Sequence, residues 1–179
     1  MEYSQLDNAK RPAMTSLAGL WGLYAGLALC FVSVLQNFIL KSNSGGISFT
    51  MGMLNFAIMI VLFYFGIKAY RDTTPDLPFS YGLAVKFGMY QGLFASIILT
   101  AFFTLIIFVI KPNYIQLLEQ AAIEQYQNMG LNEDVIEESM RFAKLFMTPG
   151  WLITSTLVGT WFTGLIASLV AAAIAQRKK

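Results

Sequence analysis

The stretch FGMYQGLFASIILTAFFTLIIFVI, residues 87–110, decides the fold, because it runs for 24 residues without a charged side chain. An α-helix rises about 1.5 Å per residue, so about 20 residues cross the roughly 30 Å hydrocarbon core of a bilayer. Three further apolar stretches reach a similar length, at residues 17–40, 49–69 and 151–175. The one charged residue within these stretches is Lys68, beside an end. The sequence therefore predicts four transmembrane helices.

Composition supports a membrane protein and leaves little chain for anything else. Hydrophobic residues make up 56% of the 179 residues and charged residues 12%, against roughly 25% charged residues in a soluble domain. The net charge of +2 is small and the basic residues are scattered, which argues against a nucleic-acid partner. The apolar composition instead predicts that the lipid bilayer is the main partner of the chain. We expect an all-α polytopic protein whose residues 1–179 form a single membrane domain.

Orientation follows from lysine and arginine, which favour the cytoplasmic ends of membrane spans. Eight of them flank the spans on one side: Lys10, Arg11, Lys68, Arg71, Lys86, Arg177, Lys178 and Lys179. Four lie on the other side: Lys41, Lys111, Arg141 and Lys144. This distribution predicts that both termini are cytoplasmic and that the connection between the third and fourth spans is extracytoplasmic.

That connection contains a predicted helical segment at about residues 112–148. Its first half has apolar and amide side chains at spacings of three and four, typical of an amphipathic helix: Tyr114, Leu117, Leu118, Ala121, Ala122, Gln125, Tyr126 and Met129. Gly130 ends this helix, and Asn132 is a suitable N-cap for a second helix over residues 133–146. We therefore expect an extracytoplasmic helical hairpin, with its apolar faces covered by its own bundle, by the bilayer surface or by a partner.

The hairpin is also acidic, with six of the ten carboxylates of the chain. Four of them crowd its second helix: Glu133, Asp134, Glu137 and Glu138. Helical spacing places Glu133 with Glu137, and Asp134 with Glu138, on shared faces. The pattern indicates a solvated acidic surface, with a partner surface or weak divalent-cation binding as the alternatives.

Small residues in three spans predict faces of close helix packing. Gly22 and Gly26 form one GxxxG pattern, and Gly88 and Gly92 form another. The fourth span has two further sets: Ser155 and Gly159, with Thr163, and then Gly164 and Ser168. Such residues let backbones approach closely in lipid, either within one chain or between the copies of a homo-oligomer.

Amide side chains at membrane depth require hydrogen-bond partners. The chain places Gln36, Asn37 and Asn55 toward the predicted outer leaflet and Gln91 toward the inner one. Interhelical hydrogen bonds, worth about 0.6 to 2 kcal/mol each, are the expected use. A polar lining for a solute path is the alternative. The spans contain no carboxylate, arginine or histidine, which counts against an ion-driven transporter.

The sequence offers little for catalysis. It has no histidine, and its one cysteine, Cys30, allows no internal disulfide. It has no phosphate-loop, metal-binding or nucleophile-elbow motif. We therefore predict no cofactor, no metal site and no catalytic residue, and an enzyme is the less favoured interpretation.

Four segments resemble one family: LPFSYGLAVKFGMYQGL (77–93), IKPNYIQ (110–116), MTPGW (147–151) and GLIASLVAAAIAQRKK (164–179). They are similar to the bacterial family known as domain of unknown function 4199, small four-span membrane proteins with a long loop between spans three and four. The resemblance implies this architecture and a bacterial inner-membrane location. It brings no catalytic or binding residues with it.

The expected function is a non-enzymatic accessory or scaffold subunit that packs through small-residue faces and presents its outer hairpin to a partner, either a second copy or another membrane protein. A small channel or transporter is the alternative, and it requires the amides to converge on one path. An enzyme acting on a lipid-linked substrate is a further alternative, with the acidic hairpin residues as its candidates.

Overall fold

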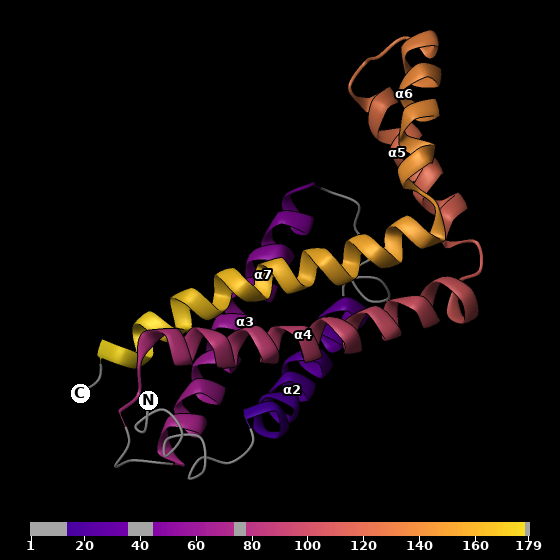
Figure 1. Cartoon of the computed structure of the whole chain (residues 1–179). Coiled ribbons are helices and arrows are strands. Elements are labelled where there is room, and N and C mark those ends of the chain that lie inside the picture. The colour runs from indigo at the N-terminus through magenta and orange to yellow at the C-terminus, as the bar shows by residue number, and fades with distance from the viewer. Residues whose placement is uncertain (1–13, 36–44, 74–77, 178–179) are drawn as a thin grey trace. The chain divides into compact units, whose positions relative to one another are not determined.

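The computed structural model describes residues 14–35, 45–73 and 78–177, and most of these residues are helical (Figure 1). The helices are α2 (Met14–Val34), α3 (Gly45–Asp72), α4 (Tyr81–Leu105), α5 (Tyr114–Asn128), α6 (Glu133–Phe146) and α7 (Pro149–Arg177). A π-helical turn, η2 (Ile106–Ile110), continues α4. No strand occurs within these described ranges. The predicted all-α class is confirmed.

Within the described residues, four helical segments are long and apolar enough to cross a membrane: Met14–Val34, Thr50–Asp72, Tyr81–Ile110 and Pro149–Gln176. Only 22% to 39% of the most apolar part of each is buried within the chain. The remaining apolar side chains require a nonaqueous environment, because exposing apolar surface to water is unfavourable in free energy. The prediction of four helices suited to span a bilayer is confirmed, and the chain is a multi-pass membrane protein.

The contacts divide the chain into two compact units. The first consists of Met1–Leu99 with Val158–Lys179, and the second of Thr100–Leu157. The first unit therefore holds α2, α3, most of α4 and the C-terminal part of α7. The second holds the end of α4, η2, α5, α6 and the beginning of α7. Each unit is described by itself.

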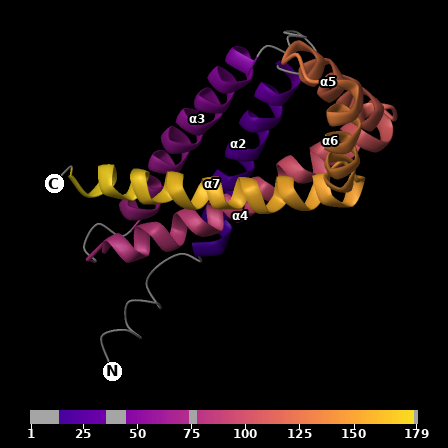
Figure 2. The same cartoon turned by 90° about the horizontal axis from the view of Figure 1, so that it is seen from above.

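The core of the first unit combines a few large side chains with many small ones. Phe63, Ile67 and Phe87 are fully buried, and Tyr70 stacks on Phe87 with ring centroids 4.8 Å apart. Helices α2 and α3 lie side by side (Figure 2). Buried alanines fill the remaining core positions: Ala18, Ala25, Ala84, Ala95, Ala167, Ala171, Ala172 and Ala175. Alanine and glycine let the backbones come close, which is how helices gain contact energy in lipid.

In the second unit, Gly130 closes the turn between α5 and α6. Its φ is +74°, a left-handed conformation that L side chains rarely adopt. The Gly130 N–H donates to the carbonyl of Gln127 at 2.9 Å, and the Leu131 N–H donates to the carbonyl of Tyr126 at 3.3 Å. This pair of bonds is the Schellman motif, which satisfies the last carbonyls of α5.

Helix α6 begins at Glu133, as the sequence predicts. Asn132 before it is extended, with ψ of 153°, but its side chain makes no cap hydrogen bond. The Lys144 ammonium lies 3.3 Å from the Glu119 carboxylate and joins α6 to α5. The second unit thus contains the helical hairpin, and its side of the membrane stays a prediction.

The turn η2 was not predicted. The Lys111 N–H donates to the carbonyl of Ile106 at 2.8 Å, a bond over five residues that widens the last turn. Residues 105–110 are uniformly apolar. A change of helical register within such a run leaves no periodic signal, so sequence reasoning cannot detect it.

Candidate functional site

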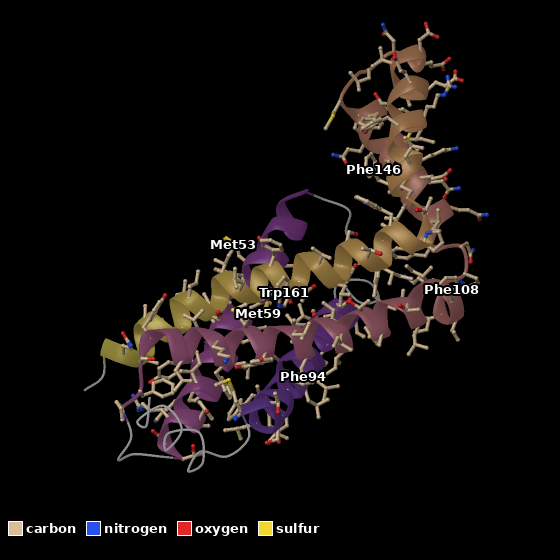
Figure 3. The ribbon with its side chains drawn as sticks, viewed as in Figure 1. Met53, Met59, Phe94, Phe108, Phe146 and Trp161 are labelled. Atoms are coloured by element: carbon tan, nitrogen blue, oxygen red, sulfur yellow. The ribbon has the colours of Figure 1, made fainter. Side chains whose placement is uncertain are left out.

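Helix α4 contacts α2 through the first GxxxG pattern. A Cβ atom added to Gly22 would lie 2.6 Å from the Cβ of Phe94 and 2.8 Å from the backbone oxygen of Gln91. One added to Gly26 would lie 2.8 Å from the Cβ of Ile98. Phe94 is labelled where α4 crosses α2 (Figure 3). Both glycines of α2 are therefore required by the close approach of α4.

The second GxxxG pattern lies on α4 itself and contacts α7. A Cβ atom on Gly88 would overlap the side chain of Ser168. One on Gly92 would lie 3.5 Å from the Cα of Gly164. The structure thus brings Gly88, Gly92, Gly164 and Ser168 together at one interface within the first unit.

Gln91 connects α4 to a third helix. Its side chain is fully buried, and its Nε2 donates to the carbonyl of Leu62 on α3 at 3.1 Å. Its Oε1 has no hydrogen-bond partner among the residues that the structure describes. That oxygen lies against Gly66, where an added Cβ atom would come within 2.7 Å. Gly66 therefore makes room for the amide, a role that the sequence analysis missed because a lone glycine in a span carries no pattern.

The other predicted amides are not joined to Gln91 in the described structure. Asn55 is half-buried on α3, and its Oδ1 finds no partner within the described ranges. It precedes Leu62 and Gly66 by 7 and 11 residues, which is about 10 to 16 Å along a helix. Gln36 and Asn37 lie outside the described residues.

The remaining small residues of α7 face away from these contacts. No described atom lies within 4 Å of a Cβ placed on Gly159. The Thr163 hydroxyl donates to the carbonyl of Gly159 at 2.8 Å, and the Ser155 hydroxyl, in the second unit, donates to Leu152 at 3.0 Å. These hydroxyls are satisfied within their own helix, so they need no catalytic explanation.

The four carboxylates of α6 are all exposed. Glu133 and Asp134 occupy the first turn, where negative charge interacts favourably with the helix dipole. Among the residues described, no three aspartate, glutamate or cysteine side chains group closely enough to hold a metal ion.

Two further contacts hold α7 against α3 and α4. Arg71, on α3, donates from Nη1 to the carbonyl of Ala175 at 3.1 Å. Tyr81, at the start of α4, donates its hydroxyl to the carbonyl of Leu169 at 3.2 Å. Ala175 lies in the last turn of α7, where carbonyls lack intrahelical partners and attract cations, whereas Leu169 lies about two turns earlier. Arg71 entered the sequence-based prediction only as a marker of orientation, because no pattern in one sequence identifies its partner.

Among the described residues outside the spans, the Tyr114 side chain has a shifted pKa. Burial raises the pKa of the Tyr114 phenol above its ordinary value of 10.0, because the ionised form would lose its hydration. Its ring meets that of Phe103 edge to face at 5.7 Å. This contact joins the first turn of α5 to the end of α4 within the second unit.

These features define a polytopic α-helical membrane protein whose third span organises the first unit. The model of the family described as protein of unknown function, DUF4199, matches residues 20–177, and the chain belongs to this family. The resemblance in the sequence is thereby confirmed. No curated protein and no solved structure matches the chain significantly.

Proposed function

We propose that this protein is a non-enzymatic accessory or scaffold subunit, which binds a second copy of itself or another membrane protein through the open face of α7. The open face consists of Gly159 and Thr163. The observation that carries the proposal is the free space around Gly159, since no described atom would meet its added Cβ within 4 Å. Glycine within a helix costs about 1 kcal/mol relative to alanine, which a close contact with another helix would offset.

Helix α7 supports this proposal by presenting two different small-residue faces. Gly164 is packed against α4, with an added Cβ only 3.2 Å from the Cα of Gly92. Gly159 lies five residues earlier, which turns it about 140° around a helix of 3.6 residues per turn. The closed face serves the protein's own fold, so a contact at Gly159 would use a surface that the fold does not need.

A disulfide crosslinking experiment tests the open face. In a Cys30→Ala background, Gly159→Cys is compared with Val158→Cys, an exposed position turned about 100° around α7. We expect oxidation in native membranes to link Gly159→Cys into a dimer or to a second protein, several-fold more than Val158→Cys. Equal linkage at both positions, or only monomer after gentle extraction and chemical crosslinking, would contradict the proposal.

The proposal includes the location. The excess of basic residues beside the termini and the connection between α3 and α4 supports cytoplasmic termini. The family resemblance supports the inner membrane of a bacterium. Gln91 supports a structural rather than a transport role for the intramembrane amides, because it is fully buried and bonded to α3.

A further inference from the structure

We infer that the C-terminal half of α6 lies on the bilayer surface, with Phe142, Leu145 and Phe146 inserted among the lipid headgroups. We call these three residues the bare face. The inference is independent of the proposed function, which concerns α7. It assigns the lipid bilayer as the partner of a surface that the described part of the chain leaves exposed.

The bare face is distinct from the buried side of the same helix. Ile136 and Met140, four residues apart, are buried within the second unit. Phe142 and Leu145 are 66% and 67% exposed, and Phe146 is exposed as well. Helical geometry places the bare face roughly 130° from the buried pair. Water is a poor surrounding for neighbouring large apolar side chains, so this face requires another cover.

Aromatic contacts connect the bare face directly to a membrane span. The rings of Phe142 and Phe146 are 5.1 Å apart, and those of Phe146 and Trp151 are 5.2 Å apart. Figure 3 labels Phe146 in this group. Trp151 is the third residue of α7, whose apolar span begins at Pro149. Tryptophan at the end of a span occupies the boundary between lipid and water. Phe146 therefore contacts a ring that itself belongs at the membrane surface.

These ring contacts keep the aromatic part of the bare face close to that boundary. Two successive contacts bring Phe142 to no more than about 10 Å from Trp151. Amphipathic helices on membranes lie in the interface with their apolar faces toward the acyl chains. The rings of Phe142 and Phe146 thus lie near the residue that marks this layer.

The distribution of charged residues along α6 also favours contact of its C-terminal half with lipid. Arg141 lies beside Phe142 in this half of the helix, and a long cationic side chain suits a headgroup layer, whereas Lys144 pairs with Glu119 of α5. All four carboxylates of α6, Glu133, Asp134, Glu137 and Glu138, lie in its N-terminal half, farther from α7 along the chain. A protein partner would not require this gradient, whereas a helix that meets lipid only at its C-terminal half does.

Spin-label accessibility in vesicles of phosphatidylcholine and phosphatidylglycerol tests the inference on the full chain. The label is placed at Phe142→Cys in a Cys30→Ala background, with Glu137→Cys on the opposite, polar side of α6 as the matched control. Val61→Cys, exposed on the span of α3, gives the value for lipid. We expect the ratio of oxygen to nickel-chelate accessibility at position 142 to exceed that at 137 several-fold and to approach that at 61.

Two results would overturn the inference. High nickel accessibility at position 142, equal to that at 137, would place the bare face in water. Low accessibility to both oxygen and nickel would place it against protein, either a second copy or another partner. Neither result bears on crosslinking at Gly159, so the two proposals fail separately.

Discussion

Gly22 is the position at which the smallest change should have the clearest effect. Alanine there would gain about 1 kcal/mol of helix propensity, but its methyl group would meet the Gln91 backbone oxygen at 2.8 Å. Overpacking of this kind costs about 1–3 kcal/mol, so Gly22→Ala should lower the free energy of unfolding.

Gly52→Ala is the matched control, because no described atom lies within 4 Å of its added Cβ. It should be neutral or stabilising by up to about 1 kcal/mol. Unfolding of both variants in detergent, followed by circular dichroism, measures the difference. Equal stability of the two variants would mean that α2 and α4 are not in close contact.

Gln91→Met tests the hydrogen bond between α4 and α3. Methionine has a similar volume, so the main loss is the bond from Nε2 to the Leu62 carbonyl. We expect a loss of about 1 kcal/mol, the usual size of an interhelical hydrogen bond in a membrane protein. Gln116→Met, at an exposed position of α5, should leave the free energy of unfolding within about 0.5 kcal/mol of the parent.

The raised pKa of Tyr114 predicts that the protein loses stability at alkaline pH. Its pKa in the folded protein is raised by burial above 10.0, so below that pH the phenol is neutral in both folded and unfolded chains. Above pH 10 the unfolded phenol ionises first, and stability falls until the pH passes the folded pKa. Thermal unfolding of Tyr114→Phe should decline less steeply above pH 10 than that of the parent. If the stability of the variant and that of the parent fell in parallel with rising pH, the pKa of Tyr114 would be the same in the folded and unfolded chains.

At the scale of the element, the hairpin depends on the turn at Gly130. Gly130→Ala adds a methyl group that meets no described atom, but it must adopt φ of +74°. The left-handed conformation costs an L residue about 1–2 kcal/mol. Hydrogen exchange should therefore become faster across α5 and α6. Gly150→Ala, also in open space but without positive φ, should leave exchange in the hairpin unchanged.

The sequence predicts elements better than it predicts their partners. The long apolar runs specify four spans, and Gly130 and Glu133 mark the hairpin turn, because these signals are local. The two GxxxG patterns look alike in sequence, yet one faces α4 from α2 and the other faces α7 from α4. The partner of Gln91 likewise depends on which helix happens to carry glycine at position 66. Such pairings are set by packing between distant segments, which one sequence does not encode as a pattern.

For the whole molecule, the predicted orientation requires opposite locations for the hairpin and the C-terminus. A reporter fused after Lys179 should indicate the cytoplasm, and one inserted at Gly130 the other side, because the basic residues are biased in that sense. Enzymatic and fluorescent reporters that function on only one side provide the measurement. Two cytoplasmic signals would reverse the assignment of the hairpin.

The central place of α4 has a consequence for how the protein is made. Helices α2 and α3 emerge from the ribosome before α4, and until it arrives Gly22 and Gly26 have no backbone to pack against. Helix α4 in turn exposes Gly88 and Gly92 until the last helix, α7, is synthesised. A nascent chain halted at either stage would present unfilled glycine surfaces within the membrane, which gives quality-control proteases a physical mark of incomplete synthesis.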